Sequence, residues 1–134
     1  MNAIILCGGK SSRMGVDKAF IKIGGKTLLG RQVEFLSGLF KKIILVTGRY
    51  SGDKEEIAAI KIKGHLKIVS DIVPDLGPLG GLYTGLKNSD SEYNFVVACD
   101  MPFISLDLAD YMAGSVKKGF QAVVPYHRNK YQPL

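Results

Sequence analysis

A loop rich in glycine and basic side chains follows the first apolar segment of the chain. Gly8 and Gly9 begin this loop, and Lys10, Arg13 and Lys18 follow. Glycine lets backbone N–H groups approach a bound nucleotide closely, and an arginine fork together with a mobile lysine suits phosphate oxygens. The composition fits either a phosphate-binding loop or an ordinary tight βα loop with solvated lysines, and does not separate the two.

This loop lacks both of the common phosphate-binding motifs. A P-loop of the form G-x-x-x-x-G-K-S/T would need glycine at position 4, where the chain has Ile4. The dinucleotide fingerprint G-x-G-x-x-G would need glycine at position 10, where the chain has Lys10. Both of these phosphate-binding motifs are therefore excluded.

Two aspartates follow strand-like apolar segments further along the chain. Asp100 comes directly after NFVVAC, and Asp71 opens a loop with two prolines and several glycines that leads into a helical segment. An aspartate at the end of a strand can cap the next turn, or it can supply the hard oxygen ligand that Mg²⁺ prefers, with water and phosphate completing the shell. We therefore take Asp100 as the candidate Mg²⁺ ligand. The loop at Asp71 is longer than a plain connection of about 2–6 residues, which favours a functional role.

The remaining pattern predicts an α/β fold, because apolar segments of strand length alternate with segments of helical period. We expect strands over residues 3–7, 42–47, 66–70, 94–99 and 121–125. We expect helices from Leu28 to Phe40, over residues 52–61, after Pro78 with an apolar face of Leu79, Leu82, Tyr83 and Leu86, and from an N-cap at Ser105 to Lys118. The prediction is one domain over residues 1–134, a three-layer α/β/α arrangement with a mostly parallel Rossmann-like sheet. Ligands bind such sheets at the carboxyl ends of the strands, where Gly8, Asp71 and Asp100 all fall.

Composition and charge argue against several classes of function. No apolar segment approaches the roughly 20 residues that cross a bilayer, and Met1 leads into the first strand without a basic secretory n-region, so we expect a cytoplasmic protein with no membrane partner. The net charge of +6 favours anionic partners, but no nucleic-acid-binding motif is evident. His65 and His127 are isolated, which argues against a zinc site.

Taken together, these residues suit attack by a phosphate on the α-phosphorus of a nucleoside triphosphate, with release of pyrophosphate. This reaction concentrates negative charge, so its catalysis consists mainly of positioning and electrostatic stabilisation. Arg13, Lys18 and a Mg²⁺ ion on Asp100 would neutralise that charge. Arg13, Lys18 and Asp100 are thus the candidate catalytic residues.

The loop also resembles a known family signature. The segment LCGGKSSRMGVDK, from Leu6 to Lys18, is similar to the pattern L-x-G-G-x-S-x-R-M-G-x-D-K of molybdenum cofactor guanylyltransferases. This is the molybdopterin-guanine dinucleotide biosynthesis protein A family, whose fold is the nucleotide-diphospho-sugar transferase (glycosyltransferase-A-like) type. Two further stretches agree in order and spacing: D-x-x-P-x-x-G-P-L-x-G from Asp71, and CDMPF from Cys99.

The resemblance implies transfer of GMP from GTP to the molybdopterin cofactor, which forms a guanine dinucleotide and pyrophosphate with the help of Mg²⁺. The Gly8–Gly9 pair and Asp17 favour guanine, since the cytidylyl-transferring relatives usually have Ala-Gly in this loop. The resemblance assigns nucleotide contacts to Leu6, Cys7, Gly8, Gly9, Lys18, Asp71, Gly77, Pro78, Leu79 and Asp100, and the metal to Asp100. The expected partners are GTP and a phosphorylated acceptor of molybdopterin type, with no nucleic acid.

The chain departs from the family pattern at three places. Cys7 stands where alanine is commoner, and Val46-Thr47-Gly48 stands where the family often has an asparagine. The chain stops at Gln132-Pro133-Leu134, which resembles the start of a further family segment, so we expect a domain that lacks its C-terminal part. Two alternatives stay open: a cytidylyl or sugar-phosphate nucleotidyltransferase of the same fold, and a nucleotide-binding module without catalysis.

Overall fold

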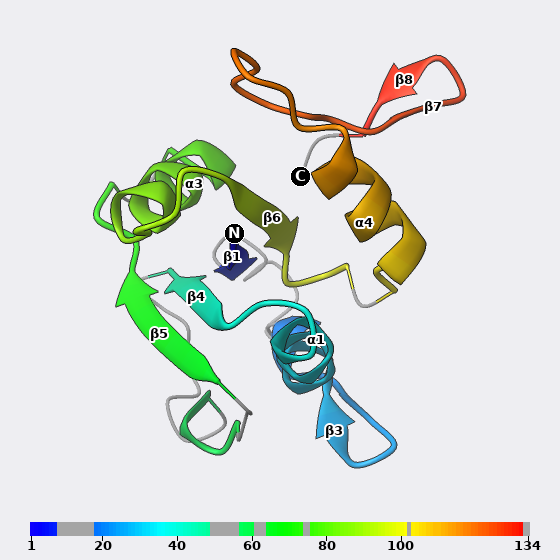
Figure 1. Ribbon diagram of the computed structural model, residues 1–134. Helices are drawn as coiled ribbons and strands as arrows, with labels where there is room; N and C mark the ends of the chain where they lie inside the picture. The colour runs from blue at the N-terminus through cyan, green and yellow to red at the C-terminus, as the bar shows by residue number, and fades with distance from the viewer. Residues whose placement is uncertain (8–17, 49–56, 61–63, 74–75, 102, 133–134) are drawn as a thin grey trace. The chain divides into compact units, whose positions relative to one another are not determined.

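The chain forms two compact units, Met1–Pro102 and Phe103–Leu134. The structure is a computed structural model (Figure 1) that describes residues 1–7, 18–48, 57–60, 64–73, 76–101 and 103–132. The expectation of one domain over residues 1–134 stays a prediction.

A parallel sheet forms the centre of the first unit. Its four strands are β1 (Asn2–Cys7), β4 (Lys42–Thr47), β5 (His65–Ser70) and β6 (Asn94–Ala98). They lie in the order β5-β4-β1-β6, and each neighbouring pair is parallel. The predicted parallel sheet is confirmed. Strands β1 and β5 each begin one residue earlier than expected, and β6 ends one residue earlier.

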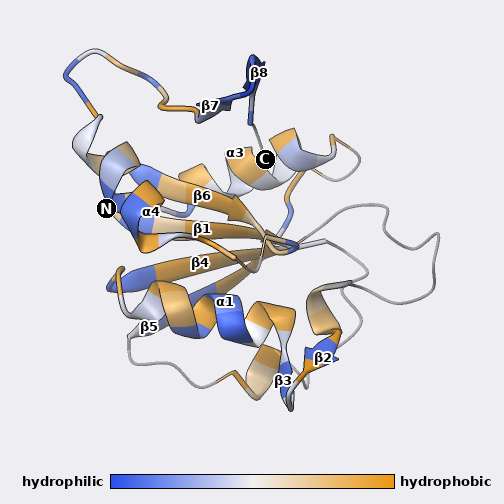
Figure 2. Ribbon diagram, turned by 90° about the vertical axis from the view of Figure 1, so that its right-hand side faces the viewer, coloured by the Kyte–Doolittle hydropathy of each residue, from blue (hydrophilic) through white to orange (hydrophobic). Residues whose placement is uncertain are grey.

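Helices cover both faces of this sheet. Helix α1 (Leu28–Ser37) lies on one side and helix α3 (Pro78–Lys87) on the other, as Figure 1 shows along the strands. Nearly all of β1 and β4 is buried, because helices cover both faces of the sheet. A strand buried on both faces is apolar along its whole length, as these two segments are. Figure 2 shows these strands as a hydrophobic band between the two helices. The three-layer α/β/α prediction is confirmed.

Helix α1 begins where the sequence indicates and ends earlier. The Thr27 side chain caps it, accepting a hydrogen bond from the backbone N–H of Gly30 at 3.0 Å. Before it come a short 3₁₀ helix, η2 (Lys18–Phe20), and the hairpin of β2 (Lys22–Ile23) and β3 (Lys26–Thr27). Helix α1 ends at Ser37 rather than at Phe40, although the Phe40 ring still stacks on Phe95 of β6 with 5.5 Å between centroids.

The apolar pattern of helix α3 predicts which face packs against the sheet, but the helix packs through the opposite face. Leu79, Tyr83 and Leu86 are 70%, 52% and 46% exposed, and only Leu82 packs partly against the core. The buried residues of this helix are Gly80, Gly81, Thr84 and Gly85. The expectation of an apolar packing face was wrong because the small residues let the helix axis approach the sheet closely, while larger side chains would hold it away.

One predicted helix of the first unit falls largely outside the described residues. Of the segment 52–61, the structure describes residues 57–60, and Ile57 and Ala58 are helical. Ile57 is buried, so the described end of this segment belongs to the core of the first unit.

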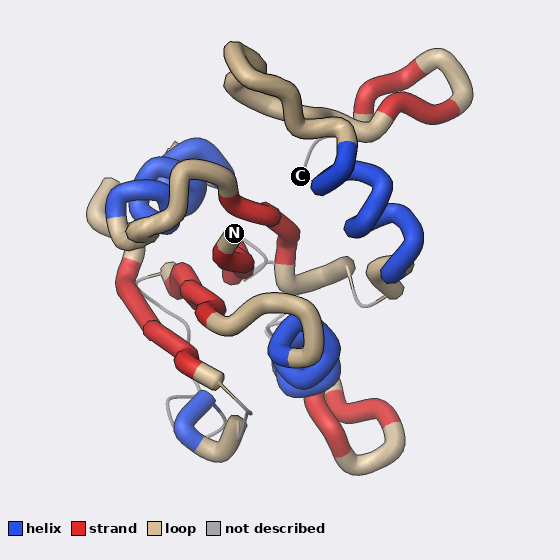
Figure 3. The backbone as a smooth tube through the Cα atoms, viewed as in Figure 1, coloured by secondary structure: helices blue, strands red, loops and turns tan. Residues whose placement is uncertain are grey.

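The second unit contains helix α4 (Leu106–Gly114) and a small hairpin, which Figure 3 traces. The predicted N-cap is confirmed, since Ser105 Oγ accepts from the backbone N–H of Leu108 at 3.4 Å. The predicted end at Lys118 was wrong: the helix ends at Gly114, and the Ser115 hydroxyl donates to the carbonyl oxygen of Tyr111 at 2.8 Å.

The strand predicted over residues 121–125 does not form. In the described part of the chain these residues pair with no other strand, and an extended segment needs a neighbour to satisfy its backbone groups. The pairing occurs just beyond, between β7 (Tyr126–His127) and β8 (Lys130–Tyr131). Arg128 and Asn129 both have positive φ, 49° and 60°, as a tight two-residue hairpin turn requires.

No helix among the described residues is long and apolar enough to span a membrane.

Candidate functional site

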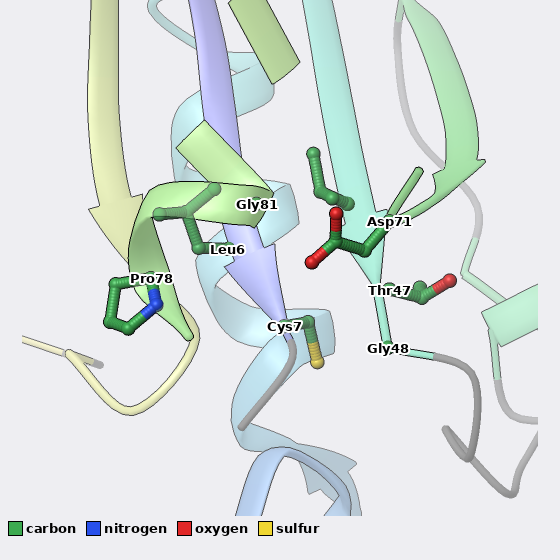
Figure 4. A pocket seen from close by; sticks show the side chains of 8 residues that line it. Leu6, Cys7, Thr47, Gly48, Asp71, Pro78 and Gly81 are labelled. Atoms are coloured by element: carbon green, nitrogen blue, oxygen red, sulfur yellow. The ribbon is translucent and has the colours of Figure 1, made fainter. Parts of the chain in front are cut away.

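A pocket lies at the carboxyl edge of the sheet in the first unit. It is formed by the ends of β1 and β4, the residue that follows β5, and the first turns of α3 (Figure 4). Its lining residues are Leu6, Cys7, Val46, Thr47, Gly48, Asp71, Pro78 and Gly81. Segments more than sixty residues apart in the chain thus meet at one place, where parallel α/β sheets bind their ligands.

The strand register brings these residues level with one another. Cys7 pairs with Thr47, and Thr47 pairs with Ser70. The ladder continues past the strands, because Gly48 N donates to Cys7 O at 3.1 Å and Asp71 N donates to Thr47 O at 2.8 Å. As predicted from the sequence, Asp71 therefore stands at the same sheet edge as Cys7, the residue that precedes Gly8.

The Asp71 carboxylate is held from two directions. Its Oδ1 accepts from the backbone N–H of Val73 and from the hydroxyl of Thr84, both at 2.9 Å. The Thr84 oxygen accepts in turn from the backbone N–H of Ile72 at 3.1 Å. Figure 4 shows the carboxylate extending from the end of β5 toward the Gly81 side of the pocket.

The first turn of α3 closes another wall. Gly77 precedes the helix with φ of 57°, a left-handed conformation that favours glycine, and Pro78 occupies the first helical turn and lines the pocket. A helix N-terminus carries partial positive charge that attracts anions. Leu79, also expected to contact the nucleotide, is 70% exposed and is not part of this pocket wall.

Asp100 stands at the same edge, next to β1. Cys99 N donates to Leu6 O at 2.9 Å, which carries the β1–β6 pairing one residue beyond β6. The turn that follows is tied to α1, since the Gln32 side-chain amide donates to Ala98 O at 2.8 Å and to Met101 O at 3.0 Å. Asp100 is exposed and does not line the pocket itself.

The residues at this edge fit a Mg²⁺ ion of the kind that nucleotides carry. Among the described residues no cluster of three or more histidine, cysteine or acidic side chains could hold a metal on its own. Mg²⁺ commonly binds through one or two carboxylates, with waters and substrate phosphates as its other ligands. The exposed Asp100 carboxylate has the hard oxygen and the open surroundings that such a site needs.

Four predicted site residues fall wholly or partly outside the described part of the chain. Gly8, Gly9 and Arg13 lie outside the described residues. Lys18 begins η2, which packs beside α1, and its side chain is not among those described.

Sequence reasoning missed two polar residues that support the site, Thr84 and Gln32. Both are buried, on helices whose sheet-facing neighbours are otherwise apolar or glycine. A single polar residue on the packing side of a helix must find a hydrogen-bond partner, and that signal was present in the sequence. The identity of each partner was not, because the partners lie on other elements.

An α/β domain with a pocket at the carboxyl edge of its parallel sheet is typical of nucleotide-binding proteins. Residues 3–134 match the sequence model of the MobA-like NTP transferase domain, and the chain belongs to this family. The family resemblance drawn from the Leu6–Lys18 signature is thereby confirmed.

Relatives with assigned names point the same way. The chain is 41% identical over 121 residues to the probable molybdenum cofactor guanylyltransferase of Peptoclostridium acidaminophilum, an alignment that covers 90% of this chain and 51% of the relative. It is 43% identical over 111 residues to the molybdenum cofactor guanylyltransferase of Syntrophotalea carbinolica, covering 83% of this chain and 49% of the relative. The chain therefore spans about half the length of these relatives.

Solved structures show the same fold. Molybdopterin-guanine dinucleotide biosynthesis protein A from Archaeoglobus fulgidus superposes with a TM-score of 0.73 at 24% identity, covering 100% of this chain and 65% of that one. HddC from Yersinia pseudotuberculosis in complex with GMP-PN superposes with a TM-score of 0.69 at 25% identity, covering 86% of this chain and 54% of that one.

Proposed function

We propose that this chain is the nucleotide-binding part of a molybdenum cofactor guanylyltransferase, which transfers GMP from GTP to the molybdopterin cofactor and releases pyrophosphate. One observation carries the proposal: Leu6 and Cys7, which begin the first family signature, share a pocket with Asp71 and Pro78 of the second. Cys99, which begins the third signature, is hydrogen-bonded to Leu6 at the same edge. Relatives of 35–43% identity that are named for this activity support it.

The proposed reaction is a displacement at the α-phosphorus of GTP. A phosphate oxygen of the acceptor forms a bond to the α-phosphorus, the bond from that phosphorus to the α,β-bridging oxygen breaks, and pyrophosphate leaves with the electron pair. The protein contributes by holding the reacting groups in line and by countering the charge on the triphosphate. No covalent intermediate with the enzyme is needed.

Each part of the edge has a proposed role in this reaction. The pocket walls at Leu6, Cys7 and Asp71 hold the nucleoside, and Gly8 and Gly9, which lie outside the described residues, are proposed as further nucleotide contacts. The N-terminus of α3, at Gly77 and Pro78, faces the anionic part of the nucleotide. The remaining proposed contacts are Leu79 on the nucleotide, Arg13 and Lys18 on the phosphates, and Asp100 on Mg²⁺.

Mg²⁺ bound at Asp100 would supply positive charge that neutralises the triphosphate and the departing pyrophosphate. The Gln32 amide contributes indirectly, because it fixes both carbonyl groups that flank the Cys99–Asp100 turn. The backbone on both sides of Asp100 is thereby held at the carboxyl edge of the sheet.

The test is thermal unfolding of the full chain with GTP, CTP, ATP or UTP, each with and without Mg²⁺. A ligand that binds only the folded state stabilises it by about 2.7 kcal/mol at 100 times its dissociation constant. We expect stabilisation with GTP that depends on Mg²⁺, followed by pyrophosphate release when the acceptor is added. Stabilisation by CTP alone would instead indicate a cytidylyltransferase, and no response to any nucleotide would contradict the proposal.

A further inference from the structure

Thr84 occupies an unusual position for a polar residue. It lies on the sheet-facing side of α3, directly before Gly85, and its side chain is 0% exposed. A buried hydroxyl without a hydrogen-bond partner destabilises the fold. The partners of the Thr84 hydroxyl therefore indicate its role. Both of them go to the segment that follows β5, and none goes to its own helix.

The two hydrogen bonds of Thr84 have opposite directions. The hydroxyl donates to Asp71 Oδ1 at 2.9 Å, and its oxygen accepts from the backbone N–H of Ile72 at 3.1 Å. A hydroxyl has one proton to donate, so accepting from Ile72 directs that proton to Asp71. Serine could make both contacts, whereas valine, of nearly the same shape, could make neither.

The two oxygens of the Asp71 carboxylate differ in their hydrogen bonding among the described residues. Oδ1 receives two donors, the Thr84 hydroxyl and the Val73 N–H. Within the described residues no group donates a hydrogen bond to Oδ2. Gly80 borders that oxygen, since a Cβ added at this glycine would lie 2.9 Å from Oδ2. Asp71 is part of the pocket wall. The two hydrogen bonds to Oδ1 fix the orientation of the carboxylate, and they therefore also fix the direction in which Oδ2 points.

We infer that Thr84 is a positioning residue of the nucleotide site: its hydroxyl orients the Asp71 carboxylate so that Oδ2 accepts a hydrogen bond from an N–H or O–H group of the bound nucleoside. The inference rests on the proposed nucleotide-binding function. Thr84 itself is buried and is not among the residues that line the pocket. Its effect on binding therefore passes entirely through Asp71.

The test is a double-mutant cycle on GTP binding by the full chain, measured by calorimetry with Mg²⁺. Thr84→Val removes the hydroxyl and should weaken GTP binding about tenfold, the effect of one hydrogen bond to a charged group. Thr84→Ser keeps the hydroxyl and should bind GTP within about twofold of the unchanged chain. Since Thr84 acts through Asp71, adding Thr84→Val to Asp71→Asn should weaken binding no further, so the two effects are not additive.

Asp100→Asn supplies the matched control, because among the described residues Asp100 shares no hydrogen-bond partner with Thr84. The effects of Thr84→Val and Asp100→Asn should add. Additivity of Thr84→Val with Asp71→Asn, equal losses for the serine and valine variants, or unchanged binding in the valine variant would each overturn the inference. If Thr84→Val fails to fold, Thr84→Ala replaces it in the same cycle. Failure of the unchanged chain to bind any nucleotide would contradict the proposed function instead, so the two failures are distinguishable.

Discussion

Gly85 of α3 lies directly against Ile4 of β1. A Cβ atom added at Gly85 would be 2.5 Å from Ile4 Cγ2 and 3.3 Å from Val46 Cγ2, inside the distances that side chains tolerate. Gly81, one turn earlier, faces Leu6 and Val46 in the same way, at ordinary contact distance. These two glycines let α3 approach the centre of the sheet, and the approach places Thr84 and Pro78 at the edge where Asp71 stands.

Gly85→Val should therefore destabilise the fold. The added side chain would be forced into Ile4, and overpacking of a close-packed core costs about 1–3 kcal/mol. Chemical denaturation of the variant and the unchanged chain measures the difference in the free energy of unfolding. Gly114→Ala is the matched control, since nothing lies within 4 Å of a Cβ there and the change should not destabilise. Equal stability of Gly85→Val and the unchanged chain would show that α3 does not pack this closely.

The ion pair between Lys42 and Asp90 should stabilise the fold at neutral pH, and acid should remove this stabilisation. Lys42 Nζ lies 2.8 Å from Asp90 Oδ2, and Asn2 Nδ2 donates to Asp90 Oδ1 at 2.8 Å. The hydrogen bond from Lys42, followed by that from Asn2, lowers the pKa of Asp90 from 3.8 to about 2. A carboxyl with a lowered folded-state pKa stabilises the fold above its unfolded value of 3.8, and this contribution is lost as the pH falls toward 2.

Urea denaturation between pH 2 and pH 6 measures that contribution. Stability of the unchanged chain should fall through the window from about 4 to about 2 more steeply than that of Asp90→Asn, which cannot titrate there. Glu92→Gln, at an exposed carboxyl nearby, serves as the control and should keep the steep fall. Identical pH profiles for Asp90→Asn and the unchanged chain would rule out the stabilising role of the Lys42–Asp90 pair.

Asp100→Asn should abolish the Mg²⁺ dependence of GTP binding while the protein stays folded. The change removes the charge of an exposed carboxylate and keeps its shape, so the sheet and the turn beside Gln32 are unaffected. Titration of GTP with Mg²⁺ and with EDTA measures the dependence directly. Asp110→Asn, at another exposed aspartate, should behave like the unchanged chain. A Mg²⁺ effect of normal size in Asp100→Asn would remove Asp100 from the metal site.

Lys18→Ala should slow turnover more than it weakens GTP binding. If the lysine counters charge that develops as pyrophosphate departs, its loss acts mainly on the transition state. Removal of one such group commonly costs about a hundredfold in turnover. Comparison of kcat with the dissociation constant for GTP separates the two effects, with the exposed Lys117→Ala as a charge-matched control. Equal effects on both quantities would make Lys18 an anchor for the nucleotide and nothing more.

Features that depend on a few neighbouring residues were predictable from the sequence. The strand over Lys42–Thr47 has the predicted bounds, because a continuous apolar segment of that length suits a strand buried on both faces. Ser105 caps its helix and Pro78 begins another, since both effects act within one turn. The positions of Asp71 and Asp100 at strand ends followed from the same local pattern.

The face that each helix presents to the sheet depended on tertiary structure. The apolar side chains of α3 at Leu79, Tyr83 and Leu86 indicated one face, and the helix packs through the opposite one. Hydrophobic periodicity indicates which side chains of a helix are apolar. It does not indicate that glycines on another face let the helix approach the sheet more closely than large side chains allow. Which face gains more contacts is decided only when the helix meets Ile4 and Val46.

The partners of the site residues were likewise decided only by the fold. The apolar pattern of the sequence predicted that Leu6, Cys7, Asp71 and Asp100 end or follow strands, and the family signatures indicated a nucleotide. The strand order β5-β4-β1-β6 then brought Asp71 level with Cys7, and the depth of α3 brought Thr84 to Asp71. A hydrogen bond between residues on two different elements depends on how those elements pack, which local sequence signals do not encode.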